Sequence, residues 1–352
     1  MSKPTGTPFE PDRVDTLGMW DVTLALPEQV EAAIGVADGI VGLPDHDDIE
    51  NVVVLGMGGS GIAGDLMIAV AGPFMATPIV VVKGYEVPNF VGPKTLCFAL
   101  SFSGNTEETI ESATAAADAG ARMVVVAAGG ELAALAGEWG APLIGLPDDI
   151  PMPRAGLGAM AIPTLAVLED VGLFPGAREW ARLTVEQLKV RRDELAKADS
   201  SATALAQRIG RTFPLIYGGG GLGGVAALRW KNQVVENAKC PSFCAQVPEL
   251  MHNDIAGWGQ HGDVTRQVMT IVNLRHDHEH PQLARRFELV REWTDEAVAG
   301  IEEVTAAGDG ALAQLFDLMF QGDVTALHLA YQAGVDPGPI PVLDAIKAAL
   351  NA

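Results

Sequence analysis

Residues 51–61 read NVVVLGMGGSG, an apolar run that passes directly into a glycine-rich turn. Asn51 to Leu55 has the composition of a strand that is buried on both faces. Residues 62–71, which follow the glycines, are compatible with a helix. A strand, a tight turn and a helix in this order predict the opening of a parallel α/β unit.

Further short apolar runs follow, each separated from the next by turn or helix signals. We predict strands at residues 78–82, 95–100, 122–126 and 142–145, and a buried helix at residues 157–171 that closes the sheet. Residues 17–37, ahead of the first strand, are predicted to form one helix. These elements predict an N-terminal helical segment over residues 1–45 and a doubly wound domain over residues 46–178.

A second unit repeats the first. Residues 213–224, FPLIYGGGGLGG, again pass from an apolar run into glycines, and a helix is expected from there to Ala238. Such repetition indicates an internal duplication. We predict a charged linking helix over residues 179–199 and a second domain over residues 200–352 with a strand near 268–274, a helix near 323–330 and a C-terminal helix. The predicted fold class is α/β, with two doubly wound domains whose parallel sheets carry helices on both faces.

Composition limits the partners. The 352 residues include 45 acidic and 23 basic side chains, a net charge of −22 that argues against nucleic acid as a partner. Three cysteines support neither a disulfide framework nor a tetrahedral zinc site. The N-terminus lacks a basic segment followed by an apolar one, and the strongly apolar runs are too short for a bilayer. We therefore expect a cytoplasmic protein that does not bind a membrane.

Residues 101–109, SFSGNTEET, place three hydroxyls where a strand meets a helix: Ser101, Ser103 and Thr106. The first N–H groups of a helix lack internal partners, so this turn can bind an anion. Gly59 and Ser60 of the first glycine turn should join them, because the carboxyl ends of neighbouring strands share one edge of the sheet. The alternative is that these hydroxyls only cap the helix. Their number favours a phosphate site in the first domain, since the second glycine turn has no hydroxyl.

The sequence argues against a nucleotide site and a metal site. A dinucleotide site would need an acidic residue after the next strand, where Lys83 stands, and a P-loop would need a GK[ST] triplet. The histidine-rich stretch HDHEH at residues 276–280 could hold a metal, but five adjacent residues cannot all converge, which favours a solvated turn. We therefore expect neither a cofactor nor a metal. Trp230 and Trp258 fit a site wall and a core equally well.

These segments resemble the paired signatures of sugar isomerase (SIS) domains. More narrowly, four stretches are similar to the bifunctional phosphoglucose/phosphomannose isomerases: PMPRAGLG (151–158), RWKNQVVENAK (229–239), PELMHNDIAGW (248–258) and GVDPGPIPVLDAIK (334–347). Two of them depart from the pattern of that family. This chain has VENAK at 235–239 where relatives have NENAK, and MHND at 251–254 where they have NHNE.

The resemblance implies interconversion of glucose 6-phosphate, mannose 6-phosphate or both with fructose 6-phosphate through a cis-enediol. It assigns proton transfer between C1 and C2 to Glu236, stabilisation of the enediolate to Arg154, and ring opening to His252 and Lys347. It also implies a homodimer in which His252 reaches the partner's site. Two alternatives stay open: a sugar-phosphate sensor without turnover, and an isomerase of another sugar phosphate, such as an amino sugar.

Overall fold

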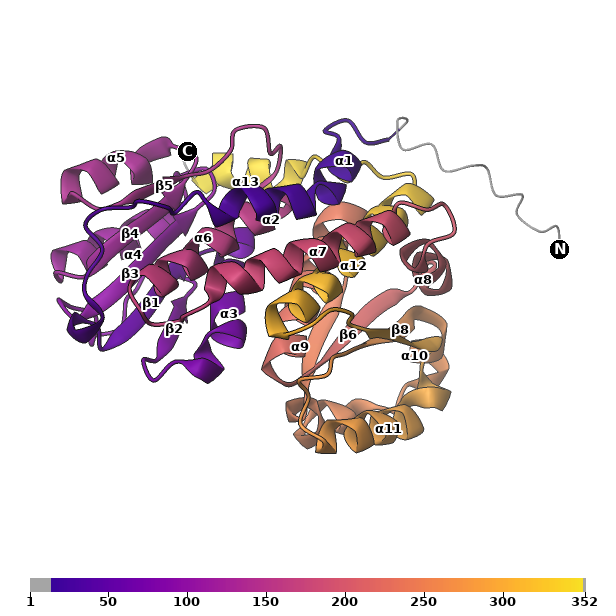
Figure 1. Ribbon diagram of the computed structural model, residues 1–352. Coiled ribbons are helices and arrows are strands. Elements are labelled where there is room, and N and C mark those ends of the chain that lie inside the picture. The colour runs from indigo at the N-terminus through magenta and orange to yellow at the C-terminus, as the bar shows by residue number, and fades with distance from the viewer. Residues whose placement is uncertain (1–13, 351–352) are drawn as a thin grey trace. The chain divides into compact units, whose positions relative to one another are not determined.

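The computed structural model describes residues 14–350, which form two compact units (Figure 1). The first unit comprises Ala25–Lys189 and Ala307–Asp317. The second unit comprises the described residues up to Leu24, Val190–Ala306 and those from Leu318 onward. Each unit contains one parallel sheet.

The sheet of the first unit has the strand order β2-β1-β3-β4-β5, with all neighbours parallel. Its strands are β1 (Asn51–Gly56), β2 (Ile79–Val82), β3 (Thr95–Ser101), β4 (Arg122–Ala127) and β5 (Leu143–Gly145). All seven residues of β3 are buried, as expected for a central strand between two helical layers. Each of the five predicted strands is therefore confirmed.

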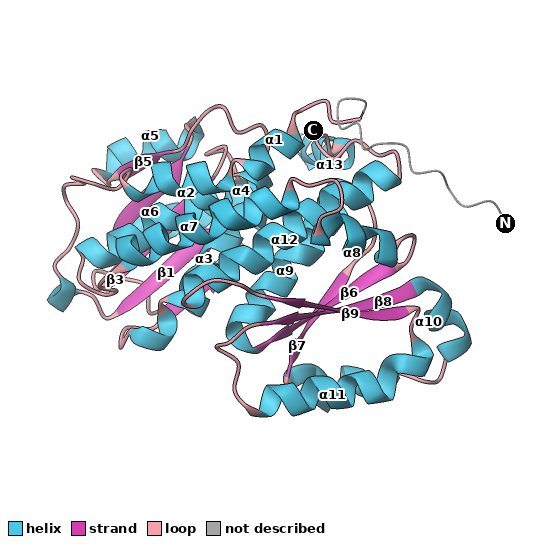
Figure 2. Ribbon diagram, turned by 45° about the vertical axis from the view of Figure 1, so that its right-hand side comes forward, coloured by secondary structure: helices cyan, strands magenta, loops and turns pink. Residues whose placement is uncertain are grey.

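Helices cover both faces of this sheet (Figures 1 and 2). On one face, α4 (Glu107–Asp118) and α5 (Gly130–Trp139) share a core with alternate strand residues such as Val53, Cys97 and Val125. On the other, α3 (Gly58–Val70) comes so close that a Cβ at Gly64 would lie 2.9 Å from Val54. The helix α6 (Leu157–Asp170) packs against α3 and α2 (Leu26–Ile34).

The sheet of the second unit has the order β7-β6-β8-β9, again with all neighbours parallel. Its strands are β6 (Phe213–Gly219), β7 (Phe243–Val247), β8 (Met269–Arg275) and β9 (Gly300–Thr305). The helix α11 (Gln282–Thr294) covers one face, and α9 (Gly220–Ala238) packs on β6 and β7 (Figure 2). The remaining helices are α7 (Ala177–Leu195), α8 (Ser201–Ile209), α10 (Gly262–Val268), α12 (Ala311–Gln332) and α13 (Pro341–Leu350). The two sheets and their helices confirm the predicted fold class.

One predicted helix needs correction, two strands were not predicted, and another helix is longer than expected. The helix predicted over residues 17–37 is two helices, α1 (Met19–Leu24) and α2, because Pro27 has no N–H to continue the helical ladder. Strands β7 and β9 were missed. Both lie at sheet edges, where two residues of each strand are exposed and most of the others are only half-buried, so neither has a strong apolar run. The helix expected at 323–330 belongs to the much longer α12.

No helix within residues 14–350 combines the length and the apolar character needed to cross a membrane.

Candidate active site

The first glycine turn joins β1 to α3 and needs glycine at Gly58 for its conformation and at Gly61 for space. Gly58 has φ +51°, a conformation that residues with a Cβ rarely adopt. A Cβ at Gly61 would lie 2.6 Å from the carbonyl oxygen of Gly56. The backbone at the N-terminus of α3 is therefore open to close approach by a ligand.

The neighbouring loop, between β3 and α4, is equally constrained. Gly104 has φ +70°, and a Cβ there would lie 1.8 Å from the carbonyl oxygen of Gly129. The Ser101 hydroxyl accepts a hydrogen bond from the Gly104 N–H at 3.1 Å and lies 2.8 Å from the hydroxyl of Thr106. Thr106 is the residue before the first turn of α4, yet its side chain makes no capping hydrogen bond. For Thr106 this geometry disfavours the capping alternative.

Hydroxyl protons remain available at this loop. Ser101 and Thr106 hold two hydroxyl protons and share one between their oxygens, so the other can be donated to a ligand. Ser101 is fully buried, whereas Thr106 is partly exposed. Ser103 is exposed, and its oxygen accepts the Asn105 N–H at 3.2 Å, which leaves its proton to donate. Ser103 and Thr106 are thus the hydroxyls best placed to reach an anion above the start of α4.

Ser60 has a different position from the other hydroxyls. It is 6 % exposed, accepts the Phe102 N–H at 3.2 Å and donates to the Met160 sulfur at 3.6 Å. Its proton is therefore already engaged within the protein. Ser60 links the first glycine turn to the loop after β3 and holds the two halves of the anion site together.

Arg154 lies against this same site. It occupies the short 3-10 turn Pro153–Ala155 and is only 4 % exposed, so it is not a surface arginine. A Cβ at Gly59 would lie 3.5 Å from the Arg154 backbone, and one at Gly156 would lie 2.9 Å from the Phe102 ring. The Arg154 turn is therefore packed against both loops, and a buried guanidinium stays charged.

Two residues that sequence reasoning did not assign support this arrangement. The Gln29 amide donates to the carbonyl oxygen of Ala155 at 2.8 Å and so anchors the Arg154 turn from α2. Lys83, at the end of β2, forms an ion pair with Asp65 of α3, and its Cε would lie 3.1 Å from a Cβ at Gly61. The signal for Lys83 was its place after the strand beside β1. Gln29 had no sequence signal, because it acts through tertiary contact alone.

In the second unit, Glu236 lies on α9 and lines a pocket of about 510 Å³. The pocket is also lined by Ile340, which directly precedes α13, and by Val342 and Leu343 of the first turn of α13. Val235, one of the two departures from the family pattern, lines the same pocket. The substitution of an apolar residue for the expected asparagine therefore changes the surroundings of the candidate base directly. Burial raises the pKa of the Cys240 thiol, which also lines this pocket, so that cysteine stays protonated.

Lys239 fixes the end of the helix that carries Glu236. It adopts the left-handed conformation, with φ 50°, and its ammonium donates to the carbonyl oxygens of Glu236 and Asp336, both at 2.8 Å. It thereby caps α9 and ties it to the segment that leads into α13. The lysine of the VENAK stretch positions this region of the second unit.

His252 and Lys347 also belong to the second unit. His252 is exposed and ends a 3-10 turn, Glu249–His252, that the buried Leu250 anchors. Lys347 is exposed on α13, the helix whose first turn lines the Glu236 pocket. The structure therefore divides the predicted site residues between the two units. The first unit contains Gly59, Ser60, Arg154 and the hydroxyl residues of the loop after β3. The second unit contains Glu236, His252 and Lys347.

Other prominent residues of the RWKNQVVENAK stretch are structural. Arg229 and Asp323 form a buried ion pair with contacts of 2.6 and 3.0 Å. The Trp230 indole is fully buried and donates to the Leu318 carbonyl oxygen at 2.6 Å. Trp230 therefore belongs to the core, whereas Trp258 is partly exposed beside the cluster under α11.

Two side chains of the loop after β8, His276 and Glu279, lie against the second glycine turn. His276 is 6 % exposed and lies 2.8 Å from the carbonyl oxygen of Gly219, so the prediction of a solvated turn at 276–280 is wrong for this residue. Burial lowers the pKa of His276, which favours a neutral ring. The Glu279 carboxylate binds the Arg275 guanidinium at 2.8 and 3.0 Å, and these hydrogen bonds raise the pKa of Arg275.

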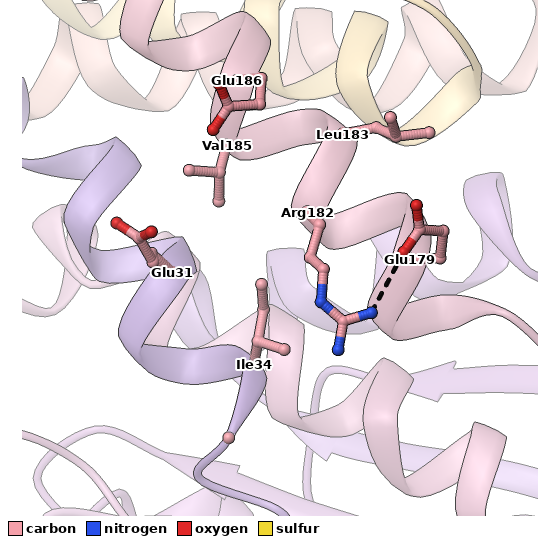
Figure 3. A pocket seen from close by; sticks show the side chains of 8 residues that line it. Glu31, Ile34, Glu179, Arg182, Leu183, Val185 and Glu186 are labelled. Atoms are coloured by element: carbon pink, nitrogen blue, oxygen red, sulfur yellow. Dashed lines mark hydrogen bonds and ion pairs between the residues drawn. The ribbon is translucent and has the colours of Figure 1, made fainter.

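Two further observations limit the search for other sites. Among residues 14–350, no group of three or more histidine, cysteine, aspartate or glutamate side chains could hold a metal ion. Another pocket of about 510 Å³ lies between α2 and α7 in the first unit (Figure 3). Its walls carry Glu31, Leu183 and an ion pair between Arg182 and Glu179 at 3.1 Å, but none of the predicted site residues.

Comparison with known proteins gives matches over most of the chain. Residues 198–350 match the model of the bacterial phospho-glucose isomerase C-terminal SIS domain. The chain is 32 % identical to the bifunctional phosphoglucose/phosphomannose isomerase of Caldicellulosiruptor bescii over 94 % of this chain and 98 % of that protein. It is 30 % identical to the enzyme of the same name from Thermoplasma acidophilum, over 84 % and 88 % of the two chains.

A solved structure shares the fold at much lower identity. It is the C-terminal domain of glucosamine-fructose-6-phosphate aminotransferase from Francisella tularensis, with a TM-score of 0.71, 16 % identity and coverage of 94 % of this chain and 100 % of that one. At this identity the likeness concerns the fold alone. The sequence relatives decide the family, since they match this chain over nearly its full length. The chain belongs to the bifunctional phosphoglucose/phosphomannose isomerase family.

Proposed function

We propose that this protein interconverts glucose 6-phosphate, mannose 6-phosphate or both with fructose 6-phosphate. The single observation that carries the proposal is the family relationship, since a 32 % identical relative covers 94 % of the chain. The first unit adds physical support. Its hydroxyls, its helix N-terminus and the buried Arg154 provide the local positive potential that a phosphate ester needs on a protein of net charge −22.

The roles of the side chains follow from the chemistry of an aldose–ketose isomerisation. A base must take a proton from one carbon and return it to the next, and Glu236, a carboxylate on the wall of a pocket, is our candidate. Arg154 would stabilise the enediolate, because a guanidinium keeps its charge throughout the reaction. His252 and Lys347 would move the protons that open the sugar ring.

Phosphate binding is assigned to the first unit. Ser103 and Thr106 would donate hydroxyl protons to the phosphate oxygens, together with backbone N–H groups at the start of α4. Ser60, Ser101 and Gly59 would shape the site and contribute less to the hydrogen bonds with the phosphate. Both serines are buried and already bonded within the protein. No metal or cofactor takes part in this proposal.

The proposal includes a homodimer and a cytoplasmic location. His252 is exposed on an anchored turn, a position from which it can reach a second chain. The three cysteines are free thiols, which suits a reducing compartment. We therefore propose that two chains complete each other's sites through His252.

One assay tests the proposed activity. Purified protein is incubated with fructose 6-phosphate in buffer containing EDTA, and glucose 6-phosphate and mannose 6-phosphate are measured separately. Formation of either product is expected, because the proposal assigns every proton transfer to a side chain. Binding of fructose 6-phosphate without either product would replace the isomerase with a sugar-phosphate sensor.

A further inference from the structure

The two units place the same strands around their glycine turns. In the first sheet β1 lies between β2 and β3, and in the second β6 lies between β7 and β8. Gly56 of β1 pairs with Leu100, and Gly218 of β6 pairs with Leu274. The loop that begins at Ser101 in the first unit therefore corresponds to the loop that begins at Arg275 in the second.

Both units also bridge these two loops with a hydrogen bond. In the first, the N–H of Phe102 donates to the hydroxyl of Ser60. In the second, the ring of His276, which occupies the position corresponding to Phe102, bonds the carbonyl oxygen of Gly219. The second turn is thus tied to its neighbouring loop as the first one is, although it has no hydroxyl.

A carboxylate occupies this second turn. A Cβ at Gly219, the residue before the first turn of α9, would lie 2.7 Å from Oε1 of Glu279. The same oxygen accepts the backbone N–H of His276 at 3.2 Å and the Nε of Arg275 at 3.0 Å. The Glu279 side chain is only 8 % exposed. It is therefore held as a ligand would be, by a guanidinium and a backbone amide, and it lies beside Gly219 at the start of the 19-residue α9.

A second observation concerns the ring of His276, which borders this turn. Nδ1 of the buried His276 has no hydrogen-bond partner among the described residues, although the opposite nitrogen of the ring is bonded to Gly219. A buried polar atom without a partner is costly in a folded protein. A monoprotonated phosphate could donate to that nitrogen, which a carboxylate cannot do.

We propose that the second glycine turn is an anion site occupied by the protein's own Glu279, and that removing this side chain opens the site to inorganic phosphate. The occupant is part of the chain, so it is present at a fixed high local concentration and excludes a free phosphate. Each chain then keeps one phosphate site for substrate, in the first unit. The inference concerns a site that the proposed isomerase reaction does not use.

The test is the thermal stability of Glu279→Ala in sodium phosphate and in sodium chloride of equal ionic strength. Both measurements use a Ser103→Ala/Thr106→Val background, so that the first-unit site does not contribute. We expect phosphate to raise the Tm of this variant by about 3 °C relative to chloride. Glu279→Gln, which still fills the turn, and Glu288→Ala, an exposed residue of α11 paired with Arg285, should show no such gain.

Equal Tm values in the two salts for Glu279→Ala would overturn the proposal. If that variant does not fold in chloride, the yield of refolded protein in phosphate decides instead. Recovery in phosphate but not in chloride supports an anion site, and equal yields contradict it. Because the background lacks the first-unit hydroxyls, this result does not depend on whether the protein is an isomerase.

Discussion

The two glycine turns differ in what their neighbouring loops supply. After β3 the loop provides neutral hydroxyls and the buried Arg154 lies beside it, whereas after β8 the corresponding loop provides Arg275, His276 and Glu279. The strand order around each glycine turn is the same, and Gly58 and Gly220 both have a positive φ, although the first sheet has a fifth strand. We therefore expect the backbone to prepare two anion sites, with the side chains of the loop after β3 or β8 deciding which of them is open to a ligand.

A division of labour follows from this difference. We expect the first unit to hold the phosphate, while α9 of the second unit carries the candidate base Glu236. Substitutions in the second unit should then reduce turnover, and substitutions in the first should weaken binding. The predictions below are ordered from the largest expected effect to the smallest.

Glu236→Gln should cause the largest loss. It keeps the shape of the side chain but removes its basicity, so kcat should fall by about 10²- to 10⁴-fold while KM changes little. Steady-state kinetics with fructose 6-phosphate measure both constants. Glu138→Gln, an exposed residue of α5, is the matched control and should leave both unchanged. A kcat within twofold of wild type for Glu236→Gln would remove this residue from the reaction.

A mixture of two variants tests whether His252 acts in the active site of the partner chain. Glu236→Gln and His252→Ala should each be inactive alone. Mixed in equal amounts, half of the dimers would be hybrids with one intact site each, which predicts recovery of about a quarter of wild-type activity. Subunit exchange is verified with differently tagged chains. If hybrids form and activity stays absent, the two residues serve the same chain, or one of the assignments is wrong.

Hydroxyls of the first unit should affect binding instead. Removal of a hydrogen bond to a charged group costs about 1.5 kcal/mol at an open site, so Ser103→Ala and Thr106→Val should each raise KM about tenfold with little change in kcat. Thr114→Val, which removes a hydroxyl bonded to the Ile110 carbonyl within α4, is the control. Unchanged KM values for both site variants would exclude these hydroxyls from phosphate binding.

Much of this site could be predicted because its signals are local in sequence. Glycine turns after apolar strands, and three hydroxyls in six residues, predict both the sheet edge and the anion site. The burial of Arg154 could not be predicted, because it depends on contacts with Gly59 and with the rest of its own turn. Nor could the role of Glu279, since a carboxylate in a polar stretch gives the same pattern whether it is solvated or held inside. Edge strands β7 and β9 were missed because two residues of each are exposed and most of the others are only half-buried.

Acid should reduce the stability of the second unit more than that of the first. His328 of α12 is 4 % exposed, and burial lowers its pKa from 6.5 to about 4. The unfolded chain therefore binds this proton more tightly than the folded chain. The contribution of His328 to the free energy of unfolding is fully present above pH 6.5. It falls by about 3 kcal/mol as the pH drops toward 4.

The matching experiment compares wild type with His328→Gln, which can still bond Thr203. Tm is measured for both proteins at pH 7.5 and pH 5. Wild type should lose more Tm than the variant, whereas His46→Gln, an exposed residue of the first unit, should behave as wild type does. An equal loss of Tm in wild type and His328→Gln would show that this histidine does not contribute to acid sensitivity.

Calorimetric titration with fructose 6-phosphate tests the division of labour most directly. The titration uses Glu236→Gln, so that bound sugar is not converted, with and without the added pair Ser103→Ala/Thr106→Val. The account predicts one fructose 6-phosphate per chain for Glu236→Gln and an affinity about 100-fold weaker once both hydroxyls are removed, if their effects add. Two equivalents per chain, or unchanged affinity without the two hydroxyls, would contradict it.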